Sequence, residues 1–274
     1  MRTPEGTRAA WDKIAAGYDQ FVTPSHISLA EEALRLVGLR AGMRFLDVAA
    51  GSGALSIPAA RLGAQVIATD ISPTMVARLE ERVREEGLEK IQGRVMDAHD
   101  MDLDDDSFDI SASQYGVMLL PDLPRALGEM VRVTRPGGRV LVTAFGPPGQ
   151  VEFLSFFLGA VKAVIPDFKG LPADPPPLPF QLADPKKFQQ EMEKAGLQEL
   201  QIETIQEELA FQSAIQLWDW VTHSHPIGAG LVADLTEAQA LNAQKVLDDM
   251  LRKRAGDSSS AVLTNATHIG IGIK

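Results

Sequence analysis

The sequence predicts an α/β fold in which a mostly parallel, doubly wound sheet carries helices on both faces. Two observations predict it. Between residues 27 and 145, short apolar runs alternate with stretches of helical periodicity, an order that favours parallel strands joined by helices. The first apolar run also leads directly into a glycine-rich turn. With 274 residues and 45% hydrophobic content, the chain can bury a sizeable core.

The elements follow in chain order. A helix is expected over residues 27–37, and residues 44–49 form a short buried strand that ends at the glycine turn. The next helix spans about 54–62, with Pro58 in its first turns, where a missing N–H donor is tolerated. The remaining core elements are a strand over 65–69, a helix over 73–86, strands over 91–96 and within 107–122, a helix over 123–134, and a fifth strand ending near 145.

The turn LDVAAGSGAL suggests a binding site for a nucleotide-like ligand. Gly51 and Gly53 permit backbone angles and a close ligand approach that a Cβ atom would prevent. Asp70 ends the second strand, where its carboxylate can accept two hydroxyl donors from a ribose. The G-x-G-x-x-G pattern of dinucleotide sites is incomplete, because Ser56 stands at the third glycine position. The ligand is therefore expected to carry a ribose but to differ from a dinucleotide.

Residues 43–145 resemble the core of a class I S-adenosylmethionine-dependent methyltransferase of the small-molecule kind, similar to ubiquinone/menaquinone C-methyltransferases. Five segments match in order, and WDKIAAGYDQF near the N-terminus resembles the family's leading helix. The five are LDVAAGSG, ATDISPTM, VMDAHDMDL, SFDISASQYGVMLLPD and EMVRVTRPGGRVLVTAF. The resemblance implies a seven-stranded, Rossmann-like sheet whose last strand runs antiparallel. Residues 197–204 and 268–273 are the expected last two strands.

The resemblance also assigns residues to S-adenosylmethionine, the implied cofactor. The first motif would surround the methionine part, Asp70 would hold the ribose, and Ile71 would lie against adenine. Asp97 would accept from the adenine amino group, and Ala98 would offer its backbone. The complete set of expected cofactor-binding residues is Tyr18, Asp47, Ala49, Gly51, Gly53, Asp70, Ile71, Met75, Asp97, Ala98 and Gln114.

The whole chain is expected to form one methyltransferase domain, with a core of about 40–146, 186–212 and 260–274. Cap elements would cover about 1–30, 147–185 and 213–256. An apolar cap helix is expected at 151–165, where Phe153, Phe156 and Phe157 can belong to a core, an acceptor pocket or a subunit contact. The last cap segment is expected to form two helices joined at residues 226–228.

Methyl transfer by in-line displacement needs a proton acceptor when the nucleophile carries a proton. The candidates are Tyr18, His26, Tyr115, His223 and His225. The expected catalytic residues are Tyr18, His223 and His225, although the two histidines can equally be solvated or capping residues at a helix end. A shared metal ion is not expected, because residues two apart point to different faces of a helix.

The composition narrows the function further. The absence of cysteine excludes disulfides and cysteine nucleophiles, and a net charge of −11 disfavours a nucleic-acid partner. The acidic run 104–106 is expected to be a solvated turn, and no metal site is expected. No apolar run approaches the ~20 residues needed to span a bilayer, so a cytoplasmic enzyme is expected. The sequence is compatible with either a monomer or a homo-oligomer.

These observations predict methyl transfer from S-adenosylmethionine to a small, partly apolar acceptor, which yields S-adenosylhomocysteine. One alternative is a non-enzymatic sensor of S-adenosylmethionine or a nucleotide, in which the cap serves as a partner-binding surface. A nicotinamide-dependent oxidoreductase is disfavoured by Ser56 and by the segment around Asp97.

Overall fold

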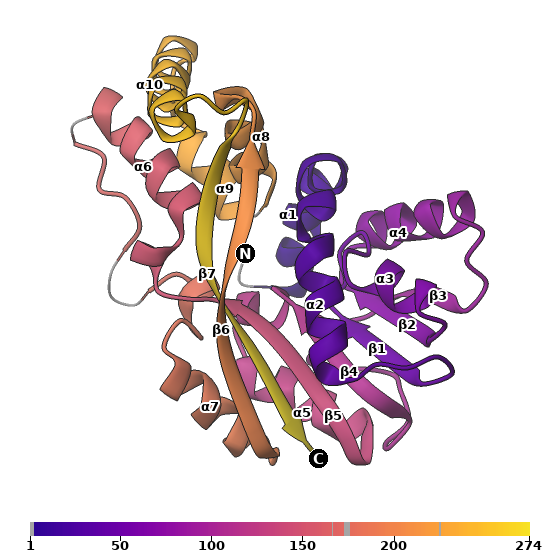
Figure 1. The fold of residues 1–274 in the computed structure, drawn as a ribbon. Helices are drawn as coiled ribbons and strands as arrows, with labels where there is room; N and C mark the ends of the chain where they lie inside the picture. Colours follow the sequence, from indigo (N-terminus) through magenta and orange to yellow (C-terminus); the bar gives the residue numbers. More distant parts are fainter. Residues whose placement is uncertain (1–2, 166, 173–175, 225) are drawn as a thin grey trace.

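A computed structural model describes residues 3–165, 167–172, 176–224 and 226–274. Its centre is a seven-stranded sheet with the order β3-β2-β1-β4-β5-β7-β6 (Figure 1). Strand β7 runs antiparallel to both of its neighbours, β5 and β6, whereas the other pairs of neighbouring strands are parallel, so the predicted sheet is confirmed. The strands are β1 Arg44–Val48, β2 Gln65–Asp70, β3 Ile91–Val95, β4 Phe108–Gln114, β5 Thr134–Phe145, β6 Gln198–Phe211 and β7 Ala261–Ile273.

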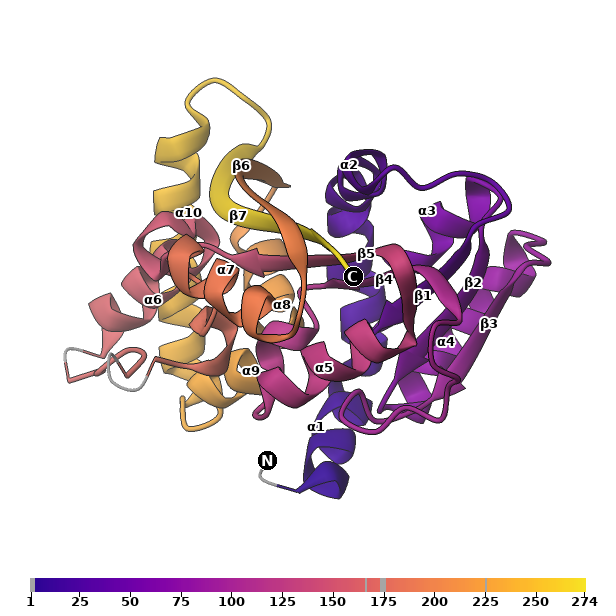
Figure 2. The same cartoon turned by 90° about the horizontal axis from the view of Figure 1, so that it is seen from below.

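Helices cover both faces of the sheet. In Figure 2, α2 and α3 lie on one side and α5 and α7 lie on the other. The bounds are α2 Ile27–Val37, α3 Ser56–Arg61, α4 Pro73–Glu85, α5 Leu123–Val133 and α7 Pro185–Lys194. Local chemistry sets several of these ends. The Ser72 hydroxyl accepts a hydrogen bond from the Met75 N–H at the start of α4, and Gly38 ends α2 in a left-handed conformation.

The N-terminal segment differs from the single leading helix expected over 11–21. Helix α1 (Pro4–Gly17) continues into a π-helix, η1 (Tyr18–Val22), then into a 3-10 helix, η2 (Thr23–His26), which leads directly into α2. Side-chain hydrogen bonds hold this segment over the core: Ser72 donates to Asp12 at 2.5 Å and Arg82 donates to Asp19 at 2.7 Å. The segment therefore crosses the carboxyl edge of the sheet without an irregular loop.

Strands β6 and β7 are longer than predicted. Residues 267–273 of β7 pair with β5, whereas residues 261–266 pair with residues 206–211 of β6 and, at Asn265 alone, form a bridge with Val151. This two-stranded ribbon, residues 206–211 and 261–266, leaves the sheet and reaches into the cap (Figure 1). Such an extension cannot be read from a local pattern, because its length depends on the helices that cover it.

The cap consists of α6 Glu152–Val164, α8 Ala214–Ser224, α9 Pro226–Val232 and α10 Glu237–Ala255. The expectation of two helices joined at 226–228 was wrong. Pro226 begins a short third helix, and proline suits a first helical position because its missing N–H has no partner there anyway. Helix α10 starts at a capping box formed by Thr236 and Gln239.

The cap has a hydrophobic cluster of its own. Phe157 is fully buried and packs on Trp218, with 5.0 Å between ring centroids, while Phe153 packs on Trp220 at 4.5 Å. Phe156 is half-buried against the same cluster. Of the three expected roles for these phenylalanines, the structure favours the core. In the described part of the chain, no helix is both long and apolar enough to cross a membrane.

Candidate functional site

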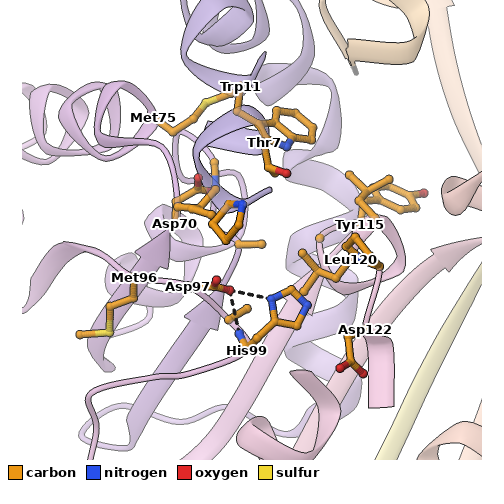
Figure 3. Close-up of a pocket in the computed structure, with 18 of the residues that line it drawn as sticks. Thr7, Trp11, Asp70, Met75, Met96, Asp97, His99, Tyr115, Leu120 and Asp122 are labelled. Atoms are coloured by element: carbon orange, nitrogen blue, oxygen red, sulfur yellow. Dashed lines mark hydrogen bonds and ion pairs between the residues drawn. The ribbon is translucent and has the colours of Figure 1, made fainter. Parts of the chain in front are cut away.

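A cavity of about 310 Å³ opens at the carboxyl ends of β1, β2 and β4, where the strand order reverses (Figure 3). We call it the main cavity. The glycine turn, the ends of β2 and β3, the loop after β4 and helix α1 all contribute to its wall. The wall consists of Thr3, Pro4, Thr7, Trp11, Tyr18, Ala49, Gly51, Asp70, Ile71, Met75, Gln114, Tyr115, Gly116 and residues 96–99, 119–122 and 125.

The glycine turn brings the backbone to the cavity. Gly51 has a φ of +56°, and a Cβ atom built on it would lie 3.2 Å from the Tyr18 ring. Gly53 has a φ of +98° and does not line the cavity. Its Cβ would instead meet Ile57 and Leu79 at 3.1 Å, so Gly53 allows the turn to pack on the helices beneath it.

Asp70 is buried beside the turn, and backbone N–H groups hold both of its carboxylate oxygens. Gly51 donates to Oδ2 and Ser72 donates to Oδ1, each at 2.9 Å. Burial raises the pKa of Asp70 to about 6, although these N–H groups oppose the shift. Each carboxylate oxygen keeps a lone pair for another donor. The side chain can therefore accept from two neighbouring hydroxyl groups.

Asp47 lies deeper, with 1% of its surface exposed. Ser56, the residue at the third glycine position, donates its hydroxyl to Oδ2 at 2.5 Å. Oδ1 is buried and has no hydrogen-bond partner among the described residues. Burial raises the pKa of Asp47 to about 7, with a further contribution from the charge of Asp70 and an opposing one from Ser56.

Asp47 lines a second, much smaller cavity of about 10 Å³, which we call the inner cavity. Tyr18, Ala49, Gln114 and Tyr115 line both cavities. The remaining wall of the inner cavity consists of His26, Asp47, Ala50, Ala54 and Leu55.

Gln114 adds a second unsatisfied acceptor to the inner cavity. Its Nε2 donates to the His26 carbonyl at 2.9 Å, while its Oε1 is buried without a partner in the described part of the chain. With Asp47 Oδ1, this makes two unsatisfied buried oxygens next to the glycine turn. Such oxygens suit a positively charged donor such as an ammonium group.

The opposite end of the main cavity holds Asp97, whose Oδ1 accepts from the His99 backbone N–H at 2.9 Å and lies 2.6 Å from His99 Nδ1 (Figure 3). Burial tends to raise the pKa of Asp97, but the hydrogen bonds from His99 outweigh this effect and hold the pKa below its usual value. The carboxylate is thus ionised and can accept from a ligand amino group. No three His, Cys, Asp or Glu side chains of the described residues gather in a way that could hold a metal ion.

Tyr18 begins the π-helix and lines both cavities, with its ring edge-on to Trp11 at 6.1 Å. Burial, together with the charges of Asp70 and Asp47, raises the pKa of the Tyr18 phenol well above its usual value. Its hydroxyl is therefore a hydrogen-bond donor near neutral pH. This geometry suits the expected contact with a cofactor better than the expected role as a base.

His223 does not line either cavity. Its Nδ1 lies 2.6 Å from the Asp219 carbonyl oxygen, so it donates a hydrogen bond there. Its ring packs on Phe21 and covers Gly17, leaving no space for a Cβ atom. His225 lies outside the described residues. The catalytic role of these histidines stays a prediction, and the position of His223 gives it no support.

The sequence analysis missed Glu207 on β6. This carboxylate is buried, and it lies 2.9 Å from His26 Nδ1 and 2.8 Å from the Tyr115 hydroxyl, which donates to it. The Tyr115 hydroxyl also shares a 2.6 Å hydrogen bond with Thr267. The only signal in the sequence is an acidic residue just beyond the predicted end of a strand, and acidic residues at strand ends are common.

Comparison with known proteins places this site in context. A family model described as a methyltransferase domain matches residues 46–142. An uncharacterised protein of Mycobacterium tuberculosis is 40% identical over 141 residues, which cover 51% of this chain and 48% of that protein. The demethylmenaquinone methyltransferase of Streptomyces avermitilis is 30% identical over 171 residues, which cover 60% of this chain and 71% of that protein.

A solved structure shares the fold. Phosphoethanolamine N-methyltransferase 2 of Haemonchus contortus, in complex with phosphomonomethylethanolamine and S-adenosylhomocysteine, matches with a TM-score of 0.56 at 18% identity. The match covers 90% of this chain and 52% of that one. The chain spans about half the length of the first curated relatives that it matches, at 48%.

Proposed function

Because the chain belongs to the class I S-adenosylmethionine-dependent methyltransferases, we propose that it transfers a methyl group from S-adenosylmethionine to a small molecule. S-adenosylhomocysteine is the second product. One observation carries the proposal: a single cavity presents a different recognition group to each part of that cofactor, and two unsatisfied buried acceptors lie where its cationic amino-acid end belongs.

The three parts of the cofactor can be assigned in turn. The adenine amino group would donate to Asp97 beside Ala98, and Asp70 would accept from the two ribose hydroxyls. The methionine end would lie against Ala49 and Gly51, with its ammonium group donating to Asp47 Oδ1 and Gln114 Oε1. Ile71, Met75 and Tyr18 complete the wall, and Gly53 supports the turn from below.

When bound, the cofactor supplies an electrophilic methyl group, and the residues of the chain supply position. Holding a nucleophile in line with the transferring carbon can contribute roughly 7–11 kcal/mol to lowering a barrier of this kind. Trp11, Leu119, Leu120 and Tyr115 give the main cavity an apolar wall beside the glycine turn. This wall favours a partly apolar methyl acceptor. The quinone substrate in the name of the Streptomyces relative favours the same class of acceptor.

The partners and location belong to the same proposal. A net charge of −11 supports a small-molecule acceptor over a nucleic acid, because a phosphate backbone would be repelled. We also propose a cytoplasmic location, and the described residues include no helix that is long and apolar enough to cross a membrane.

Titration calorimetry of the intact protein with S-adenosylmethionine, S-adenosylhomocysteine and NADH tests the cofactor assignment. We expect micromolar dissociation constants for the first two and no heat from NADH. Selective NADH binding, or no binding at all, would contradict the proposal. S-adenosylhomocysteine release is then measured across a panel of phenols, naphthols, carboxylic acids and amines. Binding without turnover on any of them would favour the sensor.

A further inference from the structure

A buried histidine–carboxylate pair lies directly behind the proposed methyl-transfer site. His26 and Glu207 are 4% and 7% exposed and are 181 positions apart in the chain. His26 belongs to η2, Glu207 belongs to β6, and Tyr115, which joins them, belongs to the loop after β4. A carboxylate is rarely buried without a compensating role, because the desolvation of its charge is costly.

The hydrogen bonds of His26 determine which of its two ring nitrogens can accept a proton. The Tyr115 hydroxyl donates to Glu207 Oε2, which leaves Oε1 to accept from His26 Nδ1 at 2.9 Å. This fixes the Nδ1–H tautomer of the neutral ring and leaves Nε2 as the proton-accepting atom. No hydrogen bond joins Nε2 to any residue that the structure describes. The carboxylate thus orients the imidazole, as it does in carboxylate–histidine pairs of other enzymes.

His26 lines the inner cavity, which borders the main cavity at Tyr18, Ala49, Gln114 and Tyr115. The volume of the inner cavity, about 10 Å³, suits one water molecule, and Gln114 Oε1 keeps a second lone pair for this water beside the one assigned to the cofactor's ammonium group. A general base can act through one water molecule. His26 therefore lies within reach of a proton released in the main cavity beside Tyr115.

Tyr18 and Tyr115, the other candidate bases that line a cavity, are less suited to accept a proton. Burial and the nearby charges of Asp70 and Asp47 raise the pKa of Tyr18 well above its usual value. Burial and the charge of Glu207 do the same to the pKa of Tyr115, whose proton is already donated to that carboxylate. Both phenols thus stay protonated near neutral pH.

We propose that His26 accepts the proton of the methyl acceptor through one water molecule, that Glu207 is its positioning residue, and that the acceptor accordingly carries a weakly acidic hydroxyl, such as a phenol or naphthol. This inference rests on the proposed function. As the acceptor oxygen bonds to the methyl carbon, the carbon–sulfur bond breaks with its electron pair remaining on sulfur. The hydroxyl proton passes to Nε2, and Glu207 balances the resulting imidazolium charge.

The rate should fall on the acidic side of its pH profile, because a protonated His26 cannot accept a proton. The titratable groups that face His26 are Glu207 from β6, Tyr115 from the loop after β4, Asp47 from β1 and Tyr18 from η1. Removing the negative charge of Glu207 should make the imidazolium easier to deprotonate. The Glu207→Gln variant should therefore shift the acidic limb to lower pH.

Nuclear magnetic resonance of ¹⁵N-histidine protein bound to S-adenosylhomocysteine tests the geometry without an acceptor. The signal that disappears in His26→Asn identifies His26. We expect it to show the Nδ1–H tautomer at pH 8, to become doubly protonated at lower pH, and to do so at a lower pH in Glu207→Gln. A His26 signal that shows the other tautomer, or that is unaffected by Glu207→Gln, would overturn the proposal.

Turnover tests the chemical role. On phenols and naphthols, His26→Asn should lower kcat about 10²- to 10⁴-fold and leave the dissociation constant of S-adenosylmethionine within twofold. The loss should be much smaller on 4-nitrophenol, which is already ionised at pH 8. The matched control is His268→Asn, because His268 is as buried as His26 but bonds Thr204 and Ala183 away from both cavities.

The outcomes separate the two proposals. If the wild-type protein fails to bind S-adenosylmethionine, the proposed function fails. If the protein binds it and His26→Asn turns over hydroxyl acceptors at the normal rate, only the inference about His26 fails. A uniform loss on phenol and 4-nitrophenol alike would indicate a structural role and would also overturn it. Should no panel member be methylated, the resonance measurement decides alone.

Discussion

Asp47 and Asp70 are two buried carboxylates whose pKa values are raised to about 7 and about 6. Without a positive partner, each pays a desolvation cost when it ionises. A sulfonium and an ammonium group would supply the missing charge, so the protonation of these residues and the binding of the cofactor should be linked. The role of each aspartate can therefore be tested by measuring the binding of S-adenosylmethionine alone.

Asp70→Asn should weaken the binding of S-adenosylmethionine about 30-fold, because hydrogen bonds to a charged acceptor contribute about 2 kcal/mol. Titration calorimetry at pH 8 measures the change. Asp102→Asn is the control, since this exposed aspartate does not line either cavity and should bind like the wild type. Equal affinities for all three proteins would refute the ribose assignment.

The affinity for S-adenosylmethionine should rise roughly 100-fold from pH 5.5 to pH 7.5, because the cationic ligand binds the ionised carboxylates. The sign follows from the raised pKa values: at pH 5.5 both aspartates are largely protonated in the free protein, and binding must release protons. Calorimetry in two buffers of different ionisation enthalpy counts those protons. Asp47→Asn should reduce the count, and an unchanged count would contradict the role of Asp47.

At the scale of elements, the site depends on a turn and a ribbon. The glycine turn sets how closely a ligand approaches the end of β1, whereas the ribbon of β6 and β7 carries Glu207 from the sheet to η2. The turn could be recognised from the consecutive residues 46–55. The ribbon could not, because its length is set by packing against the cap.

Gly51→Val should abolish cofactor binding while the fold remains. The added side chain would enter the main cavity, where its Cβ alone lies 3.2 Å from Tyr18. Gly87→Val is the matched control: Gly87 has a similar φ of +63°, but no atom lies within 4 Å of its added Cβ. Both variants bear the same backbone strain, so circular dichroism should match and only Gly51→Val should lose binding. Binding by both would contradict the assignment.

Phe157→Ala should lower the free energy of unfolding by about 3–5 kcal/mol, because it removes a fully buried ring from the cap cluster. Phe156→Ala should cost much less, since Phe156 is half-buried. Chemical denaturation of the two variants compares these costs. Equal losses would show that α6 does not bury the face that the structure assigns to it.

At the scale of the whole molecule, the acidic groups divide into two sets with opposite effects on stability. The raised pKa values of Asp47 and Asp70 favour the folded state at low pH, and this contribution is lost as the pH rises through 6 and 7. The lowered pKa values of Asp97, Asp109 and Glu129 favour it at high pH, and this contribution is lost as the pH falls below about 4.

The ligand-free protein should therefore be most stable near pH 4–5 and lose stability as the pH rises to about 7, with repulsion among the net negative charges adding to the loss. Saturation with S-adenosylmethionine at 100 times its dissociation constant should add about 2.7 kcal/mol at pH 8. Urea denaturation at several pH values measures both effects. A ligand-free stability that keeps rising from pH 6 to pH 8 would contradict the burial of these charges.

Much of this architecture could be predicted, because its signals are local. Helix α2 has the predicted bounds, and the first five strands lie where the apolar runs place them. Nine of the eleven expected cofactor residues line the main cavity, and their contact with a cofactor stays a prediction. The pair of His26 and Glu207 could not be predicted, because nothing within either segment indicates that two side chains 181 positions apart meet.

Because of the π-helix at Tyr18–Val22, the orientation of α1 relative to α2 depends on the exact number of residues in the N-terminal segment. Its wide turn, closed by a hydrogen bond from the Thr23 N–H to the Tyr18 carbonyl, takes one residue more than an α-helical turn. Deleting the exposed Gln20 would restore ordinary winding and rotate α1 by about 100° relative to α2. Asp12 could then no longer reach Ser72 while Thr23 keeps its bond to Ser52. We therefore expect a substitution of Gln20 to disturb the segment far less than its deletion does.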